Sequence, residues 1–439
     1  MVTSTEHQPR DGGVQVVLAD AELLPPALDA RRPDGGRWTG AWVVVRVAGT
    51  PVGLVELAFG GRDVIPADEV RARVDALTRE VPPRERPQVA DADLPGVSVV
   101  VATDLKRPDQ LRTCLAALAA ADHPDVEVVL VDNSRDPGVA GLAEQIASVH
   151  PGVRVVREPV PGLSAARNAG VAAAQGEVVA FTDDDVRVDP GWLRALATRF
   201  ALRPDEDAVT GLILPAELET DAQLWFERHY GGFGGERTFT PLTYRGTAVG
   251  APVSRRARVT VEDARGGVVR TFAVYGAGVA GAGANMAFRA RTLRDLGGFD
   301  PALGAGTPAR GGEDLAAIIG VLWSGGSIGF EPSAVVFHTH RADYAALRDQ
   351  VGGYGLGYTA MLSALVLTDP RHLLGLASQL PIAARTVLAR RRAPAGAPDP
   401  AIGPPPPAEL SRLSRRGAVR GPASYVRSRR VARERAAGR

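Results

Sequence analysis

Three adjacent carboxylates, Asp183, Asp184 and Asp185, directly follow the apolar run VVAFT. Adjacent carboxylates repel one another, and a fold tolerates them best when a hard cation lies among them. Along an extended chain, Asp183 and Asp185 turn to one side and Asp184 turns to the other. Two carboxylates on one side suit Mg²⁺ or Mn²⁺ bridging a diphosphate, whereas the plainer alternative is a solvated acidic turn.

A second acidic pair, Glu313 and Asp314, begins an apolar stretch that we predict to be a helix through Trp323. A carboxylate at a helix N-terminus is often only stabilised by the helix dipole, but it can also accept the proton of a substrate hydroxyl. Gly311 and Gly312 precede the pair and would let this loop move. The pair is therefore a candidate general base, with a helix cap as the alternative.

Two further segments carry polar side chains at the ends of predicted strands. VVFHTH ends with His338 and His340 on the same side, and either neutral imidazole could bind a metal; a structural histidine is the alternative. Asp132 ends VEVVLVD, where a carboxylate can accept hydrogen bonds from a nucleobase or a ribose. A turn-forming Asp-Asn-Ser sequence is the alternative for Asp132.

The segment PGLSAARNAG, residues 161–170, favours the start of a helix. Gly162 permits an unusual backbone conformation, Ser164 can cap the helix, and Arg167 lies in its first turns. A helix N-terminus with a guanidinium can bind a diphosphate or a base edge. A capped helix with a solvated arginine is the alternative.

The elements that must position these residues alternate from Val97 onward. Apolar strands are expected at VSVVVAT, VEVVLVD, VRVV and VVAFT, separated by helices at PDQLRTCLAALAAA, near 138–149, and from Ser164 to Ala174. Strands that are apolar on both faces indicate a mainly parallel sheet with helices on both faces, an α/β fold. Ligands on such sheets bind beyond the carboxyl ends of the strands, where the acidic residues lie.

The chain of 439 residues is long enough for two or three folded units. We expect a small N-terminal α/β module over 1–90, with a strand pair at WVVVRVAG and PVGLVELAF and a helix at ADEVRARVDALTRE. VPPRERPQ follows as a linker, a catalytic domain covers 91–345, and helices with a flexible basic tail cover 346–439.

Charge is spread unevenly over a chain whose formal net charge is +1. Residues 385–439 hold 14 Arg against Asp399, Glu409 and Glu434, a net +11, so the remainder carries −10. A basic tail indicates an anionic membrane or polyanion partner, with a solvated tail as the alternative.

Cys114 is the only cysteine and is expected in the core. We find no signal peptide and no apolar run of the ~18 residues that span a bilayer, so we expect a cytoplasmic protein.

The ordered segments from Val97 to His340 resemble the family 2 glycosyltransferases, which have the GT-A (Rossmann-like) fold. The resemblance rests on the strand ending at Thr103 and on LVDNS, LSAARNAG, TDDD, GANMAFR, GGFD, GGED and the strand-end histidine. It implies an inverting transferase that moves a sugar from a nucleotide-diphosphate donor to a glycan, lipid-linked or small-molecule hydroxyl, in cell-envelope or glycolipid synthesis, with no nucleic-acid partner.

The resemblance also implies a role for each matching residue. Asp314 would be the general base and Glu313 would position the acceptor or the base. The segment 283–289, with Asn285, would line the sugar side of the cleft. The other implied roles are nucleotide binding by Thr103, Asp132 and Arg167, ribose binding by Asp183, and Mg²⁺ or Mn²⁺ binding by Asp185 and His338.

Three features depart from the family pattern or compete with it. The loop DLKRP after Thr103 is one residue longer than usual, which leaves the role of Arg107 open, and residues 233–271 match no family segment. The segment GAGVAG from Gly276 fits a dinucleotide fingerprint but lacks the helix and second strand that this motif requires. A nucleotidylyltransferase and a non-catalytic sugar-nucleotide or membrane-binding protein remain as alternative functions.

Overall fold

The computed structural model describes residues 12–81, 87–233, 237–380 and 406–437. The chain forms two compact units. Unit 1 contains residues 1–87, 215–232 and 339–347, and unit 2 contains 88–214, 233–338 and 348–439. These units differ from the expected contiguous domains, because two short segments from the middle of the chain fold with the N-terminal module. Most of the expected linker, residues 82–86, lies outside the described residues.

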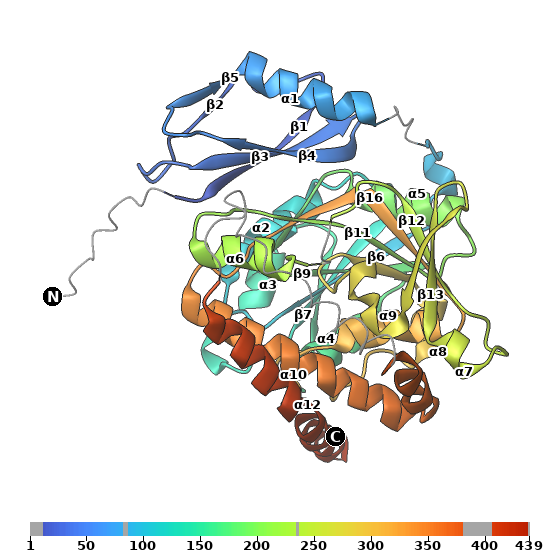
Figure 1. Cartoon of the computed structure of the whole chain (residues 1–439). Helices are drawn as coiled ribbons and strands as arrows, with labels where there is room; N and C mark the ends of the chain where they lie inside the picture. The colour runs from blue at the N-terminus through green and yellow to red at the C-terminus, as the bar shows by residue number, and fades with distance from the viewer. Residues whose placement is uncertain (1–11, 82–86, 234–236, 381–405, 438–439) are drawn as a thin grey trace. The chain divides into compact units, whose positions relative to one another are not determined.

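Unit 1 is built on a three-stranded sheet in the order β1-β3-β4 (Figure 1). Its strands are β1 (Val14–Asp20), β3 (Gly40–Val47) and β4 (Thr50–Ala58), and β2 (Ala27–Asp29) pairs with β5 (Val64–Pro66). The expected strand pair is antiparallel, and the expected helix is α1 (Ala67–Glu80), which buries Val70 and Val74. Both predictions are confirmed. The unit also contains α6 (Asp221–Tyr230).

Unit 2 contains a sheet of 11 strands whose first half is parallel, as predicted. Strands β8, β7, β6 and β9 lie side by side and all pair in parallel. Their bounds are β6 (Val97–Thr103), β7 (Val126–Asp132), β8 (Val153–Arg157) and β9 (Val178–Asp183). The connecting helices are α2 (Pro108–Ala119), α3 (Leu142–Ala147) and α4 (Leu163–Ala173). The α/β class is confirmed.

Beyond β9 the sheet continues in the order β9-β15-β11-β16-β12-β13-β14, with antiparallel pairing between β9 and β15, β15 and β11, β16 and β12, β12 and β13, and β13 and β14. The strands are β11 (Ala208–Pro215), β12 (Leu242–Gly246), β13 (Arg258–Asp263), β14 (Val268–Ala273), β15 (Met286–Arg289) and β16 (Ser327–His338), and β10 (Val186–Val188) pairs with β16. Residues 233–271, in which the sequence motifs identified no family segment, supply the last strands of this sheet and α7 (Val253–Arg256). The fingerprint-like segment lies in a 3₁₀ helix, Val274–Ala280, and not between a strand and an α-helix.

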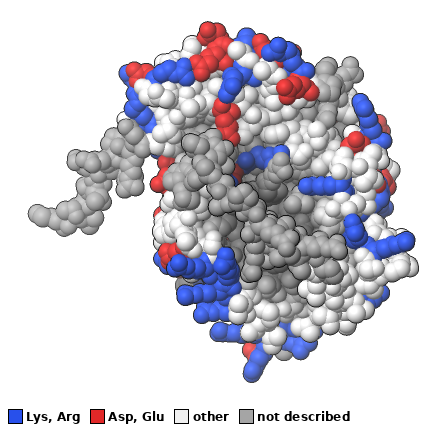
Figure 2. All heavy atoms as spheres, in the orientation of Figure 1, with Lys and Arg blue, Asp and Glu red and all other residues white. Residues whose placement is uncertain are grey.

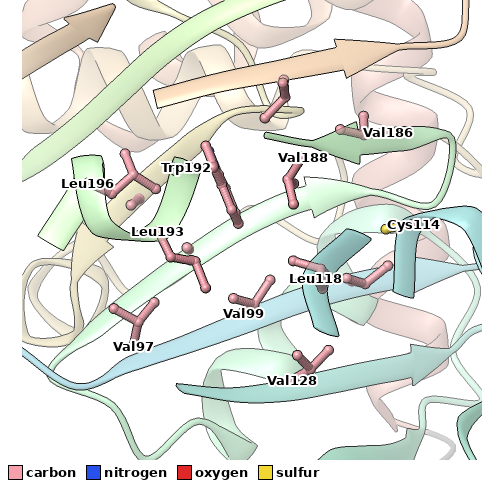
Figure 3. Close-up of a cluster of buried hydrophobic side chains, with 14 of the residues drawn as sticks. Val97, Val99, Cys114, Leu118, Val128, Val186, Val188, Trp192, Leu193 and Leu196 are labelled. Atoms are coloured by element: carbon pink, nitrogen blue, oxygen red, sulfur yellow. The ribbon is translucent and has the colours of Figure 1, made fainter. Parts of the chain in front are cut away.

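The main core of unit 2 lies between the parallel strands, α2, β10 and α5 (Trp192–Leu202) (Figure 3). Trp192, Leu193 and Leu196 of α5 face Val97 and Val99 of β6 across this core. Cys114 of α2 is fully buried in the same cluster, which confirms its expected place. These apolar contacts hold the carboxyl ends of the strands in fixed positions relative to one another.

The C-terminal part of the chain contains two long helices, α10 (Tyr344–Thr368) and α12 (Ala408–Ala437). The expected flexible tail is therefore wrong for residues 408–437, because α12 packs through small residues and Tyr425 and is ordered by those contacts. Within the described residues, α10 is long and apolar enough to cross a membrane by length and composition, a run that the sequence reading missed. One third of its most apolar window is buried. Arg385 and Arg390–Arg392 lie outside the described residues.

Candidate functional site

The carboxyl ends of β6, β7 and β9 bring three of the predicted site residues to one edge of the sheet. Thr103 is paired in register with Asp132, and Ala102 is paired with Asp183. Parallel pairing aligns the ends of strands whose sequences are far apart, so the register alone places these side chains next to one another. The structure thus places Thr103, Asp132 and Asp183 at the carboxyl ends of their strands, as expected.

Asp184 is held by Thr103 of β6 and by Arg107 in the loop after this strand. Its Oδ2 accepts a hydrogen bond of 2.7 Å from Thr103 Oγ1, and its Oδ1 pairs with Arg107 Nη2 at 2.9 Å. Burial raises the pKa of Asp184 to about 6, with the guanidinium of Arg107 opposing this rise. The other nitrogen of Arg107 pairs with Asp185, so one guanidinium bridges two members of the acidic trio.

Asp183, Asp185 and His338 form the cluster that could hold a metal ion. One ligand atom from each residue lies within 4.8 Å of the others, and His338 Nε2 lies 3.4 Å from Asp185 Oδ1. Asp185 and His338 are buried, whereas Asp183 keeps 30% of its side chain exposed. Two carboxylates and one imidazole suit Mn²⁺ or a similar divalent cation, so the residues fit the expected ion.

The two strand-end histidines have separate environments. His338 is the last residue of β16, and its ring lies 4.5 Å from the ring of Phe233. His340 belongs to unit 1, where its Nε2 lies 2.6 Å from Glu227 Oε1 and its carbonyl accepts from Gln223. Strand alternation no longer applies after His338, because β16 ends there, and so only His338 joins the acidic cluster.

Arg167 connects the acidic trio to the predicted general-base pair. Its Nη1 lies 2.8 Å from Glu313 Oε1, and its Nη2 lies 3.2 Å from Asp183 Oδ1 and 3.3 Å from the carbonyl oxygen of Gly283. The arginine side chain is 3% exposed, so Asp183, and Glu313 when it is ionised, offset the charge of a buried cation. The guanidinium thus brings together two acidic segments that are 130 residues apart in sequence, since Asp183 and Glu313 both bind it.

The pair Glu313 and Asp314 begins α9 (Glu313–Trp323), as predicted. Gly312 at the N-cap has φ 90°, and a Cβ there would lie 2.8 Å from the carbonyl oxygen of Gly357 in α10. Only glycine fits this backbone conformation and this close approach without strain. Asp314 Oδ2 accepts a hydrogen bond of 2.8 Å from the backbone N–H of Gly283. Asp314 is therefore positioned next to the carbonyl that holds Arg167.

Glu313 is buried, and its environment favours the protonated carboxyl. Burial raises the pKa of Glu313 from 4.5 to about 7, the charge of Asp314 adds to the rise, and Arg167 opposes it. Between pH 4.5 and about 7, Glu313 therefore keeps its proton in the folded protein but loses it in the unfolded chain. The stability due to this proton is complete below the unfolded pKa of 4.5 and is lost as the pH rises through about 7.

We expect Glu313→Gln to flatten the pH dependence of stability, because glutamine is neutral at every pH. The free energy of unfolding, measured with urea between about pH 5 and about pH 8, should fall less steeply with pH in the variant than in the wild type. Glu144→Gln, an exposed carboxylate in the first turn of α3, is the matched control and should leave the slope unchanged. Parallel pH curves for Glu313→Gln and the wild type would contradict the assignment.

Asp132 lies at the carboxyl end of β7, as predicted, but its carboxylate is already paired with Arg157, a residue that the sequence did not indicate. Arg157, the last residue of β8, lies 2.6 Å from Asp132 Oδ1 and donates to Ser134 Oγ at 2.9 Å. The backbone N–H of Ser134 donates to the same carboxylate oxygen at 2.8 Å. The Arg157 side chain is about half exposed, and it adds a positive charge beside Asp132.

Asn285 does not lie in the site, contrary to the expected role in sugar binding. It is fully buried in the sheet, where its Oδ1 accepts from Trp192 Nε1 at 2.8 Å. Its amide nitrogen donates to the carbonyl oxygens of Leu212 and Ala334 at 3.1 and 2.8 Å. These bonds use the polar atoms of the side chain to join β11, β16 and α5, which leaves none directed at a substrate.

Ser164 is the second residue whose place differs from the expectation. It does not cap α4, because the N-cap is Gly162 with φ 133°, and the Ser164 hydroxyl instead donates to the carbonyl of Leu303 at 2.8 Å. This bond ties the start of α4 to the loop before α9. Of the segment 283–289, Gly283 contacts the site through its backbone, and Met286–Arg289 forms β15.

Two arginines that the sequence analysis did not assign to the site, Arg107 and Arg157, contribute charges to it. Arg107 lies one residue before α2. The signal in the sequence was a basic residue beside Pro108, in the loop that follows the strand ending at Thr103. No comparable signal pointed to Arg157, which is one of many arginines in the chain. Its proximity to Asp132 follows from the pairing of β7 with β8.

Comparison with known families gives a match to the model described as "Glycosyl transferase family 2" over residues 98–258. That range covers the strands β6 to β9, Thr103, Arg107, Asp132, Arg167 and the acidic trio. It ends before Glu313, Asp314 and His338, whose place in the site therefore rests on the geometry described above.

Curated relatives are similar over part of their length. A putative glycosyltransferase, EpsH, of Bacillus subtilis (strain 168) is 31% identical over 100 residues, 23% of this chain and 29% of that protein. The pre-mycofactocin glycosyltransferase of Mycobacterium tuberculosis is 26% identical over 301 residues, 66% of this chain and 52% of that protein. The alignments thus span between about a quarter and half of these relatives.

Solved structures also align with the chain, at low scores. The mannosyltransferase PcManGT from Pyrobaculum calidifontis, in complex with GDP-Man and Mn²⁺, aligns with a TM-score of 0.41 and 19% identity, covering 80% of this chain and 90% of that one. TarS of S. aureus aligns with a TM-score of 0.39 and 16% identity, covering 61% and 65%. The match of residues 98–258 to the model described as "Glycosyl transferase family 2" agrees with the motifs and with their placement at the strand ends.

Proposed function

We propose that this chain transfers a sugar, with inversion of configuration, from a nucleotide-diphosphate donor to an acceptor hydroxyl, and that it requires a divalent cation. The observation that carries the proposal is the ionic link through Arg167 between the cluster of Asp183, Asp185 and His338 and the start of α9. A cation-binding cluster and a carboxylate base are the two components that such a transfer needs in one site.

In the proposed mechanism, Asp314 removes the acceptor proton while the acceptor oxygen forms its bond to the anomeric carbon. The bond from that carbon to the diphosphate breaks, and its electron pair leaves with the diphosphate. A single displacement of this kind inverts the configuration at the carbon. A divalent cation held by Asp185 and His338, next to Asp183, would offset the negative charge of the departing diphosphate.

The remaining residues bind and orient in this proposal. Thr103, Asp132 and Arg167 hold the nucleotide, and Asp183 holds its ribose. Glu313 keeps Arg167 in place through a buried ion pair of 2.8 Å. Holding the donor and the acceptor in one geometry removes the entropy cost of bringing them together and supplies part of the acceleration. We place the enzyme in the cytoplasm at the inner face of the plasma membrane, in glycolipid or cell-envelope synthesis; the basic helix α12 supports the membrane part.

Donor binding and turnover test the proposal against its two alternatives. UDP-, dTDP- and GDP-sugars are screened for thermal stabilisation with and without Mn²⁺, because a ligand that binds only the folded state raises the melting temperature. The stabilising donor is then assayed for transfer and for slow hydrolysis. Release of nucleoside diphosphate supports the transferase. Donor synthesis from a nucleoside triphosphate would indicate a nucleotidylyltransferase, and binding without any turnover would indicate a non-catalytic protein.

Arg107 is expected to compete with the cation for Asp185. We predict that Arg107→Gln binds Mn²⁺ about fivefold to tenfold more tightly than the wild type when donor is omitted, because a partly exposed ion pair worth about 1 kcal/mol is removed. Titration of free Mn²⁺ by electron paramagnetic resonance measures this directly. Lys106→Gln in the same loop removes an equal charge that pairs only with Asp104, and it should change nothing. Unchanged or weaker Mn²⁺ binding in Arg107→Gln would refute the competition.

A further inference from the structure

The helix α12 has two sides of different chemistry. Its buried side consists of Leu410 and small or polar residues together with Tyr425. Its exposed side carries Val419 and Val426, which are 82% and 61% exposed and lie seven residues apart, on one helical face. The exposed arginines are Arg412, Arg415, Arg416, Arg420, Arg427, Arg430 and Arg433.

Close packing against α10 fixes which side of α12 faces outward. A Cβ at Gly417 or Gly421 would overlap Gly352 or Thr359 of α10, so the two helices approach at these glycines. Thr359 Oγ1 also donates to the carbonyl of Ala418 at 2.7 Å. The orientation of the basic face is thus set by specific contacts.

The outward face has a strong excess of positive charge. Residues 410–433 include eight arginines and no acidic residue. The two acidic residues of α12 are already paired: Glu409 with Arg348 at 2.5 Å and Glu434 with Arg430 at 2.9 Å. Figure 2 shows basic side chains gathered along α12. Most of these arginines therefore have no carboxylate on their own helix to neutralise them, and an anionic partner would complement them.

We propose that the exposed face of α12 is a docking surface for an anionic lipid membrane. Guanidinium groups near an anionic lipid surface each contribute about 1 kcal/mol, and valine side chains between them can enter the region below the headgroups. The valines favour lipid over nucleic acid, because a phosphate backbone offers nothing for an exposed apolar pair to bury against. The partner is thus identified by two features of one face, its charge and its apolar residues.

The inner side of the same helix contacts two loops of the candidate site. Tyr425 Oη donates to Asp300 Oδ2 at 2.8 Å, in the loop that leads to α9. Arg435 Nη1 donates to the carbonyl of Pro161 at 3.0 Å, next to the N-cap of α4 that carries Arg167. A membrane on the outer face would therefore bind the element that supports both loops. This link between the membrane-facing helix and the candidate site rests on the proposed transferase function. If both hold, the acceptor hydroxyl belongs to a molecule carried in the membrane.

Vesicle flotation of the full chain, without donor or acceptor, tests the surface independently of any enzymatic activity. The protein is mixed at low salt with vesicles of phosphatidylcholine alone or with about 25 mol % phosphatidylglycerol. We expect flotation only with the anionic vesicles. Arg416→Glu/Arg420→Glu/Arg427→Glu should weaken binding at least about a hundredfold, from reversal of three charges. The control Arg258→Glu/Arg265→Glu/Arg270→Glu changes charge equally on exposed parts of the β13–β14 hairpin and should float like the wild type.

Three outcomes would overturn the proposal: no flotation of the wild type, equal flotation with neutral vesicles, or equal loss in the control variant. Binding of single-stranded RNA that the α12 variant loses, in the absence of flotation, would assign the face to nucleic acid instead. Melting temperatures of both variants are measured first, and Val419→Ser/Val426→Ser provides a second variant with no charge change. It should reduce flotation, because it removes the apolar part of the surface.

Discussion

Asp314→Asn is expected to lower kcat by about a thousandfold while donor affinity stays within about twofold of the wild type. Asparagine matches the size of aspartate but does not accept a proton at neutral pH, so the acceptor hydroxyl would have no base. The measurement is the rate of nucleoside diphosphate release at saturating donor and acceptor, with donor affinity determined by calorimetry. The two carboxylate oxygens of Asp314 accept backbone hydrogen bonds, Oδ2 from Gly283 and Oδ1 from Leu315, and asparagine keeps one of these bonds through its Oδ1.

Asp295→Asn provides the matched control for this prediction. Asp295 is an exposed carboxylate in α8 (Ala290–Leu296), and its replacement should alter kcat by less than about twofold, as for surface substitutions. A rate close to the wild type in Asp314→Asn would exclude Asp314 as the base. A loss of donor affinity equal to the loss of rate would instead assign Asp314 to substrate binding.

Asp185→Asn is expected to remove the metal dependence of donor binding. Replacement of one anionic ligand by a neutral amide weakens the hold on a divalent cation, and with it the affinity for a diphosphate that binds through the cation. Donor titration by calorimetry with and without Mn²⁺ should show a gain in affinity of about a hundredfold or more in the wild type and little gain in the variant.

The control for Asp185→Asn lies in the same acidic trio. Asp184→Asn removes an equal charge one residue away, but Asp184 binds Thr103 and Arg107 and is not one of the clustered ligand atoms. It should keep most of the metal dependence. Equal losses in the two variants would show that total charge, and not coordination by Asp185, controls donor binding.

The parallel half of the sheet was predictable because its signals are local. Runs such as VVAFT and VEVVLVD are apolar on both faces, and that pattern is typical of strands covered by helices on both sides. The start of α9 at Glu313 followed from the acidic pair and the apolar stretch after it. The second half of the sheet was not predicted, because β15 and β12 are short, and β15 pairs with β9 and β12 with β16, both far away in the sequence.

The misplacement of Asn285 and the missed role of Arg107 have a common physical reason. Both depend on contacts between residues far apart in sequence: Asn285 bonds to Trp192 across 93 positions, and Arg107 bonds to Asp184 across 77. Residue type alone does not tell whether a polar side chain satisfies its hydrogen bonds inside the sheet or directs them at a substrate. The helical tail was missed for the same reason, because tertiary contacts, and not charge pattern, order α12.

Local sequence patterns predicted which residues could do the chemistry and at which strand ends they lie, because side-chain alternation and helix periodicity act over a few residues. Which of these residues meet depends on the folded chain. It separated His340 from His338, placed Arg167 between Asp183 and Glu313, and set the protonation of Glu313 through burial. Burial and charge pairing depend on contacts between residues that are far apart in sequence, and local sequence patterns do not reveal those contacts.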